Sequence, residues 1–251
     1  DLSQIVGKDN IGNITAVKGG TYDKKTGIAR YSTAVEKPSY TYATGSNAVS
    51  LTVEFTLDMS KLPKSPFTDV TAGAWYYDAA LYAYNKGLMV GTSDTAFGPD
   101  VSMTRAMLVS VLWRLAGEPA PKGTNTFDDV PNGAWYTDAV TWAAENGVVA
   151  GIGNGRFDPD GSVTREQTAV ILFNYAQSKG YDVSARADLS VFPDAGSVSG
   201  WAQDALAWAN ASGLISGAVR GTQTILDPQG SASRAQVAMI LMGYVEHVVN
   251  A

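Results

Sequence analysis

The alternation of apolar and polar residues divides the chain into a β-rich start and a longer helical part. Over residues 49–57, Val, Leu and Phe alternate with Ser, Thr and Glu, which is the period-two pattern of a half-buried strand. Residues 22–31, around a Lys-Lys-Thr-Gly turn, are typical of a hairpin. Because three or four strands rarely form a free-standing domain, we expect residues 1–62, linker included, to be the end of a larger domain, with a small β module as the alternative.

The remaining chain predicts two helices in each of three similar segments. Each first helix is followed by a glycine, which suits the left-handed conformation common just past a helix end. Each second helix carries apolar residues at the i, i+3, i+4 and i+7 spacing of a buried face. The first helices and their glycines are about 75–86 with Gly87, 135–146 with Gly147, and 201–212 with Gly213. The apolar positions of the second helices are Leu108, Val111, Leu112 and Leu115, then Ile171, Leu172 and Tyr175 with Thr168 interrupting, then Val237, Ile240, Leu241 and Tyr244.

These segments are copies of one repeat. The first copy contains Phe67, Asp69, Trp75, Asp78, Gly87, Gly91, Phe97, Pro99 and Arg105, and the second has the same residue types 60 positions later, from Phe127 to Arg165. The third runs from Phe192 to Arg234, with one extra residue before the Trp, three more before the Pro, and Ile225 aligned with Phe97 and Phe157.

Repeats of this kind bury their apolar faces against one another and need about three copies. Three equivalent apolar helices predict a mainly α fold with a central three-helix bundle and a cleft between each pair of neighbours. We place the repeats at residues 63–121, 122–186 and 187–251.

Composition excludes several classes of protein. With 45% hydrophobic residues the chain is globular, and without Cys it has no disulfide, thiolate metal site or Cys nucleophile. A net charge of −6, with no Lys/Arg cluster, argues against binding nucleic acid. No apolar run is long enough for a membrane helix, so we expect no membrane insertion. The chain starts at Asp1, which suggests a processed or excised piece.

An arginine opens each predicted second helix: Arg105 after Thr104, Arg165 after Thr164, and Arg234 after Ser233. The Thr or Ser is typical of a capping box. A cation at the first helical position opposes the helix dipole, at a cost of a few tenths of a kcal/mol, up to about 1. Either each Arg pairs with a carboxylate of the fold, or it joins free amides at the helix start to hold an external anion.

Two other sets of repeated residues are candidates for binding. Trp75, Trp135 and Trp201 are either plugs of the core or platforms for a sugar ring. Gly91, Gly151 and Gly217 either satisfy turn geometry or let the backbone approach a ligand closely.

The order Phe-x-Asp, Trp, Gly-Leu or Gly-Val, Gly, Phe-x-Pro and Thr-Arg-Ala or Thr-Arg-Glu resembles the surface-layer homology domain, over about residues 66–251. The resemblance implies three repeats in a pseudo-threefold spindle, on a secreted protein of the bacterial cell surface that is associated with the cell wall. It also implies non-covalent anchoring to secondary cell-wall polysaccharide, commonly a glycan bearing pyruvate ketals.

In that family the Arg of the Thr-Arg-Ala-Glu motif binds the glycan, which maps onto Arg105, Arg165 and Arg234. A ketal carboxylate suits an Arg fork, and pyranose faces suit an aromatic platform. The second repeat, around Arg165, matches the family pattern most closely. The first repeat departs from it at Gly98 and Met107, and the third at Ser233 and Ile225.

Rival chemistry fits less well. The Asp158–Gly161 loop fails the EF-hand spacing, because Arg156 and Gln167 fall where carboxylates are required. We read Asp69, Asp129 and Asp194 as turn formers, and expect no metal and no cofactor. The single His247 lies near the C-terminus, and the acids repeat with the fold whereas a catalytic pair is expected once, so we predict no catalytic residues and no enzyme.

Two classes of function stay open. The first is a binding module that anchors a surface protein to cell-wall glycan. The second is a structural lattice protein whose repeats self-associate. A catalytic domain outside this sequence would make the chain the anchor of an exoenzyme.

Overall fold

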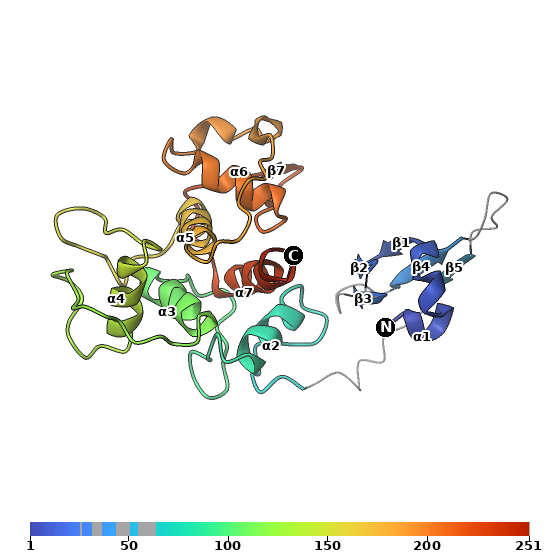
Figure 1. Ribbon diagram of the computed structural model, residues 1–251, viewed down its shortest axis with the longest axis horizontal. Helices are drawn as coiled ribbons and strands as arrows, with labels where there is room; N and C mark the ends of the chain where they lie inside the picture. The colour runs from blue at the N-terminus through green and yellow to red at the C-terminus, as the bar shows by residue number, and fades with distance from the viewer. Residues whose placement is uncertain (26, 32–36, 44–50, 55–63, 251) are drawn as a thin grey trace. The chain divides into compact units, whose positions relative to one another are not determined.

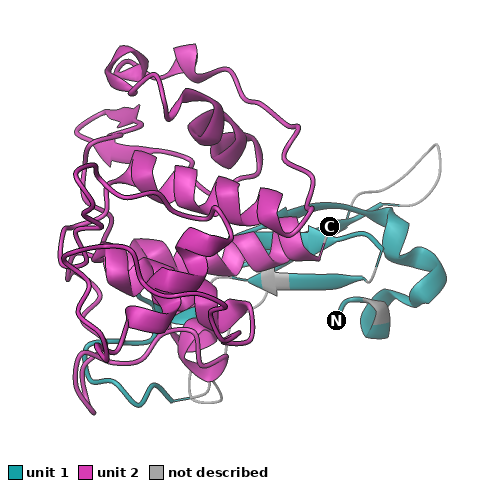
Figure 2. Ribbon diagram, turned by 60° about the vertical axis from the view of Figure 1, so that its left-hand side comes forward, with its two compact units in different colours: residues 1–78 teal, residues 79–251 magenta. Residues whose placement is uncertain are grey.

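The computed structural model describes residues 1–25, 27–31, 37–43, 51–54 and 64–250. It divides into two compact units, residues 1–78 and residues 79–251 (Figure 2). The first unit contains short strands, and the second contains most of the helices.

The first unit is built from short strands around a small core. It opens with α1 (Ser3–Val6) and the 3-10 helix η1 (Lys8–Asn13). A three-stranded antiparallel sheet has the order β1 (Ile14–Lys18), β4 (Ser39–Tyr42), β5 (Leu51–Glu54), and β2 (Gly20–Asp23) pairs with β3 (Ile28–Tyr31). Leu2, Ile14 and Tyr40 form the buried cluster, against which Val53 packs.

Two predictions for this unit have different outcomes. The hairpin is confirmed as the β2–β3 pair, in which Tyr22 faces Ala29. The half-buried strand is only partly correct: β5 exists, but the side chain of Leu51 is exposed, because β5 lies at the sheet edge and the core is centred on Ile14 and Tyr40. The predicted strand positions 49, 50 and 55–57 lie outside the described residues.

The helical part has six longer helices, two in each repeat. They are α2 (Tyr77–Asn85), α3 (Arg105–Leu115), α4 (Thr137–Glu145), α5 (Arg165–Ser178), α6 (Gln203–Ala211) and α7 (Arg234–Tyr244). The third repeat adds the 3-10 turns η3 (Leu189–Val191) and η4 (Ala195–Ser197), the hairpin of β6 (Ala218–Arg220) and β7 (Gln223–Ile225), and a π-helical turn, η5 (Val245–Val249).

Local signals set these boundaries. Gly87, Gly147 and Gly213 follow their helices with φ of 68°, 67° and 71°, as predicted from their positions. The first helix of each repeat begins two residues later than predicted, because each Trp lies in a turn ahead of its helix and not in its first turn.

The second helices supply the core of the second unit, where α3, α5 and α7 converge and α4 and α6 lie outside them (Figure 1). Leu112, Leu172 and Leu241, at equivalent positions, are fully buried. The rings of Tyr175 and Tyr244 pack with centroids 5.8 Å apart. Burial raises the pKa of Tyr175 to about 12 and raises the pKa of Tyr244 as well, so both phenols remain neutral at physiological pH.

The segments leading into these helices are joined by a ring of backbone hydrogen bonds. Met103 N donates to Ala232 O at 2.8 Å, Ala232 N donates to Val163 O at 3.0 Å, and Val163 N donates to Met103 O at 2.8 Å. All three residues are completely buried. Each repeat is thus hydrogen-bonded to both of the others at a buried position in the core. Loss of a hydrogen bond there lowers the free energy of unfolding, because the unpaired group has no water to replace its partner.

Candidate functional site

The start of each inner helix is capped as the sequence indicates. Thr164 and Ser233 form full capping boxes with Gln167 and Gln236. Thr104 accepts from the amide of Met107 at 3.2 Å, but Met107 has no polar group to return the bond. Side-chain capping therefore satisfies the third amide of each helix.

The two preceding amides donate to the neighbouring repeat. In α3, Arg105 N donates to Gly161 O at 2.9 Å and Ala106 N donates to Pro159 O at 3.0 Å. The first two amides of α5 donate in the same way to Gly230 O and Pro228 O, and those of α7 donate to Val101 O and Pro99 O. The hypothesis that free amides at these helix starts hold an external anion is therefore wrong, because protein carbonyls already occupy them.

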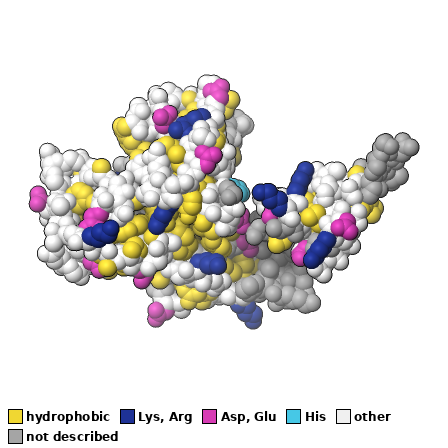
Figure 3. All heavy atoms as spheres, viewed as in Figure 1, with side chains coloured by type: hydrophobic (Ala, Val, Ile, Leu, Met, Phe, Trp, Pro, Cys, Tyr) yellow, Lys and Arg dark blue, Asp and Glu magenta, His cyan; other side chains and the backbone are white. Residues whose placement is uncertain are grey.

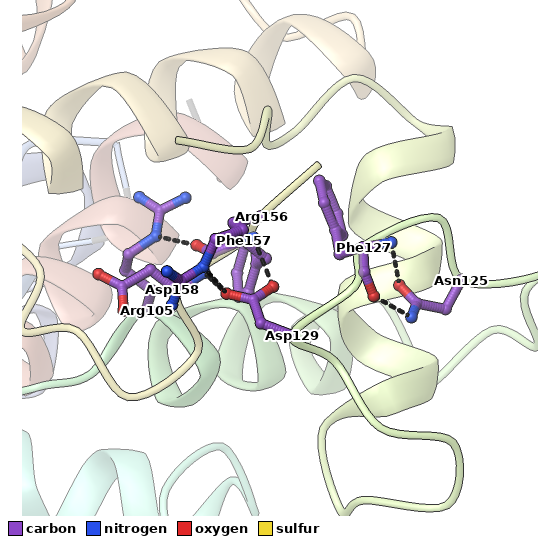
Figure 4. A network of polar contacts seen from close by, with 7 residues as sticks. All are labelled: Arg105, Asn125, Phe127, Asp129, Arg156, Phe157 and Asp158. Carbon is purple, nitrogen blue, oxygen red and sulfur yellow. Dashed lines mark hydrogen bonds and ion pairs between the residues drawn. The ribbon is translucent and has the colours of Figure 1, made fainter. Parts of the chain in front are cut away.

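The arginine side chains contact the same neighbouring repeat as the amides at the start of their helices. Arg105, Arg165 and Arg234 are only 5–6% exposed. Nε of Arg105 donates to Phe157 O at 2.8 Å (Figure 4). Its Nη2 donates to Ala150 O at 3.2 Å, and its guanidinium carbon lies 4.8 Å from the centroid of the Phe157 ring. Arg234 repeats this arrangement with Phe97 O, Val90 O and the Phe97 ring.

Arg165 has fewer contacts than the other two. Its Nε donates to Leu226 O at 2.8 Å, while its buried Nη2 has no hydrogen-bond partner in the described part of the chain. Its neighbour is Leu226, which corrects the alignment of the third repeat: Leu226, and not Ile225, fills the place of Phe97 and Phe157. The hairpin of β6 and β7 absorbs the extra loop residues and ends at Ile225, so the next residue enters the core.

Electrostatics around these arginines come from the fold's own acids. Burial lowers the pKa of Arg105, and this effect is opposed by the charges of Asp158 and then Asp129. For Arg165, burial is opposed by Asp227 and then Asp194. Within the described residues neither of these two arginines comes within 4.0 Å of a carboxylate oxygen, so the ion-pair alternative is wrong for Arg105 and Arg165. Backbone carbonyls are the main partners, and the acids act at longer range.

Asp129 and Asp194 hold the loop that these arginines contact. Asp129 accepts hydrogen bonds from the amides of Phe157 and Asp158, both at 2.8 Å, and lies 3.4 Å from Nε of Arg156 (Figure 4). Burial opposes ionisation of Asp129, but these hydrogen bonds outweigh it and lower the pKa of its carboxyl. Asp194 accepts equivalently from the amides of Leu226 and Asp227. Both carboxylates therefore clamp a distant loop, beyond the turn-forming role expected of them.

Two clefts lie at equivalent interfaces between repeats. The Arg105 cleft, of about 410 Å³, is lined by Arg105, Val148, Val149, Ala150, Gly151, Ile152, Gln167, Val170, Ile171, Asn174 and Trp201. The Arg234 cleft, of about 510 Å³, is lined by Met89, Val90, Gly91, Thr92, Met103, Met107, Val111, Arg114, Trp135 and Arg234. In each, one repeat supplies the arginine, a second supplies the glycine loop and helix, and the third supplies the Trp.

The repeated tryptophans are surface residues. Trp135 and Trp201 are each 60% exposed and Trp75 is 52% exposed, so the alternative that they plug the core is wrong. The ring of Trp135 meets that of Tyr136 edge-on, with centroids 5.1 Å apart. Trp75 meets Tyr76 in the same way within the first unit. The buried indoles are those of Trp142 and Trp208, on α4 and α6.

Glycines of the loops are required by close packing. A Cβ on Gly151 would lie 2.4 Å from Arg156 O, and one on Gly217 would lie 2.6 Å from a methyl group of Thr224. Gly217 also has a φ of 103°. The structure thus explains Gly151 and Gly217 by loop geometry. Gly91 and Gly151 in addition line the two clefts.

Sequence reasoning missed four side chains that shape these clefts: Met107, Arg114, Gln167 and Asn174. Arg114 and Asn174 occupy the same repeat position on α3 and α5. The sequence did contain an indication of this role: both residues are polar, and both lie on helices that are otherwise recognised by the spacing of their apolar residues.

Four other observations concern the described residues. They contain no group of three or more His, Asp or Glu side chains placed to hold a metal ion. His247 lies 3.1 Å from Ser212 O through Nδ1. None of the described helices has the length and apolar character needed to cross a bilayer. On the face drawn in Figure 3, Lys and Arg side chains are scattered and do not gather in one patch.

Comparisons with known proteins identify the family of the repeats. The family model of the S-layer homology domain matches residues 66–106, 126–169 and 191–238, which is more than half of the chain. The chain therefore belongs to the S-layer homology domain family.

Among curated relatives, the surface-layer 125 kDa protein of Lysinibacillus sphaericus is 31% identical over 164 residues, covering 65% of this chain and 13% of that protein. An endoglucanase of Bacillus sp. (strain KSM-635) is 31% identical over 182 residues, covering 72% of this chain and 19% of that protein. The chain thus spans less than a fifth of the length of these relatives. A solved undecaheme cytochrome from the S-layer of Carboxydothermus ferrireducens matches with a TM-score of 0.36 and 20% identity, over 67% of this chain and 20% of that one.

Proposed function

We propose that this chain anchors a surface protein to the bacterial cell wall, non-covalently, by binding secondary cell-wall polysaccharide in the clefts between its repeats. The observation that carries the proposal is the repeated grouping in the two clefts. Each combines a motif arginine, a loop glycine and an exposed Trp, taken from different repeats. Membership of the S-layer homology family supports a place on the cell surface, in association with the cell wall.

The repeats form a pseudo-threefold spindle in this proposal, with units at residues 63–121, 122–186 and 187–251. The ring of backbone hydrogen bonds and the identical direction of the arginine contacts support it. Trp75, Gly217 and Arg165 are included in the proposed binding set on the basis of their repeat positions alone.

Within this proposal the arginines and tryptophans have different tasks. Trp135 and Trp201 present open aromatic faces on which a pyranose ring can stack. Arg105 and Arg234 hold the glycine loop in place and put positive charge into the cleft wall, where an acidic substituent such as a pyruvate ketal gains from it.

A sedimentation assay with purified wall polysaccharide tests the proposal. Trp135→Ala combined with Trp201→Ala should abolish most binding while the fold is kept, because both side chains are largely in solvent. Mild acid removal of the ketals from the polysaccharide should also weaken binding by the unaltered chain. Trp113→Phe is a matched control, because Trp113 belongs to neither cleft lining. Full binding by the double variant refutes the proposal.

Two relatives suggest what such an anchor carries, since one is named as a surface-layer protein and another as an endoglucanase. The lattice alternative makes a different prediction, namely that the chain assembles into arrays without glycan. Light scattering measured over a range of protein concentrations distinguishes the two functions. A lattice protein should assemble as its concentration rises, whereas an anchor should stay monomeric until polysaccharide is added.

A further inference from the structure

The two clefts share a framework but differ in lining. Gln167 of the Arg105 cleft is replaced by Met107 in the Arg234 cleft, and Asn174 is replaced by Arg114. Met89 and Met103 also line the Arg234 cleft. One cleft therefore offers neutral amides, and the other offers an apolar wall with an additional guanidinium.

Arg114 and Asn174 are held by the same contact. Nη1 of Arg114 donates to Leu88 O at 3.1 Å, and Nδ2 of Asn174 donates to Val148 O at 3.3 Å, with both carbonyls at the same repeat position. This shared anchor fixes each side chain at the cleft wall. The residue at this position is thus a cation in the first repeat, an amide in the second and Gly243 in the third.

Arg114 is the accessible cation of the Arg234 cleft. Its side chain is 25% exposed, whereas Arg234 is only 5% exposed and donates to two backbone carbonyls. Glu118 faces Nε of Arg114 at 3.8 Å, which is an ion pair but too long for a hydrogen bond. Glu118 is itself not part of the cleft lining and offsets only part of the charge of Arg114. Among the described residues no carboxylate lines this cleft, so a negative group that enters it meets Arg114 without an acid in the wall beside it.

We propose that Arg114 contacts the carboxylate of an acidic glycan unit in the Arg234 cleft, and so makes this cleft selective for acidic over neutral sugars. This inference rests on the proposed function and names the ligand chemistry of one cleft. A guanidinium fork matches a planar carboxylate. Met107 and Val111 provide an apolar surface for a compact substituent beside that carboxylate, while Trp135 faces the sugar ring.

Titration calorimetry of the full chain with three disaccharides tests the assignment: one carrying a pyruvate ketal, its ketal-free counterpart, and a phosphorylated form. Arg114→Asn introduces the residue of the other cleft, which keeps the backbone anchor as Asn174 does. We expect about a tenfold or greater loss of affinity for the ketal disaccharide, the effect of losing one charge-assisted hydrogen bond. Affinity for the ketal-free disaccharide should not change.

Two further variants guard against a purely structural effect. Asn174→Arg should raise affinity for the ketal disaccharide by transferring the cation to the Arg105 cleft. Glu118→Gln should leave affinity within about twofold, because an exposed ion pair contributes little. Equal losses by Arg114→Asn for the ketal and ketal-free sugars, or no loss for either, overturn the inference, and so does a preference for the phosphorylated sugar. If the unaltered chain binds none of the disaccharides and no wall polysaccharide, the proposed function itself fails.

Discussion

Replacing Arg105 and Arg165 by Ala in separate variants should destabilise the fold by unequal amounts. Arg105 donates two hydrogen bonds to carbonyls of the neighbouring repeat and lies over an aromatic ring. Arg165 donates one, to Leu226 O, and its Nη2 is buried without a partner among the described residues. The structure therefore predicts that the two variants differ although the motif residues are the same.

The magnitude follows from the interactions that each substitution removes. A hydrogen bond from a charged donor contributes about 1.5–3 kcal/mol, and a partly desolvated cation–π contact contributes about 1. Arg105→Ala should therefore lower the free energy of unfolding by about 4 kcal/mol, and Arg165→Ala by about 2. Because a typical domain has only about 5–15 kcal/mol of stability, both effects are large and distinguishable.

Urea unfolding followed by far-UV circular dichroism measures the difference. The shift of the midpoint should be about twice as large for Arg105→Ala, with unchanged dependence of the free energy on urea. Arg105→Lys is the matched control, and should fall between the wild type and the Ala variant because it keeps the charge but loses the planar fork. Equal shifts, or a larger shift for Arg165→Ala, would show that these interactions do not set the stability of the interfaces.

Two other predictions concern single positions. Gly147→Ala should cost about 1 kcal/mol in urea unfolding, because Gly147 has a φ of 67° although an added Cβ would meet nothing within 4 Å; Gly200→Ala, also in open space and without a positive φ, is the control and should be nearly neutral. Asp129 should contribute a pH-dependent part of the stability, since its folded pKa is lowered: the contribution is present above the unfolded pKa of about 3.9 and is lost as pH falls through the lower folded value. Asp129→Asn should accordingly flatten the loss of stability as the pH falls below about 4, and an unchanged acid limb would contradict the clamp.

Local features of the fold were predictable from sequence because their causes are local. The capping residues Thr164 and Ser233 and the helix-ending Gly147 are each determined by contacts within a few positions. The exposure of the tryptophans was not predictable in this way. Each lies two residues ahead of its helix, so its side chain leaves the apolar face on which the helical period would place it.

The partners of the arginines could not be read from the sequence, because they are distant along it. Arg105 contacts a carbonyl 52 positions away, and Arg234 contacts one 137 positions away. The misplaced alignment at Ile225 has a related cause, since a hairpin formed by the inserted residues ends there. Aligning the repeats shows which residue type occupies each repeat position. Which of these residues are in contact depends on how the repeats pack against one another.

The ring through Met103, Val163 and Ala232 limits how many repeats can be assembled. Each member uses its amide toward one neighbour and its carbonyl toward the other, so the cycle is saturated once the third copy has joined. A fourth copy would find no open position in it, unlike in a solenoid, where every end repeat can accept another. Lengthening such a protein through this interface therefore requires a second complete trio, and the count of three is a property of the geometry itself.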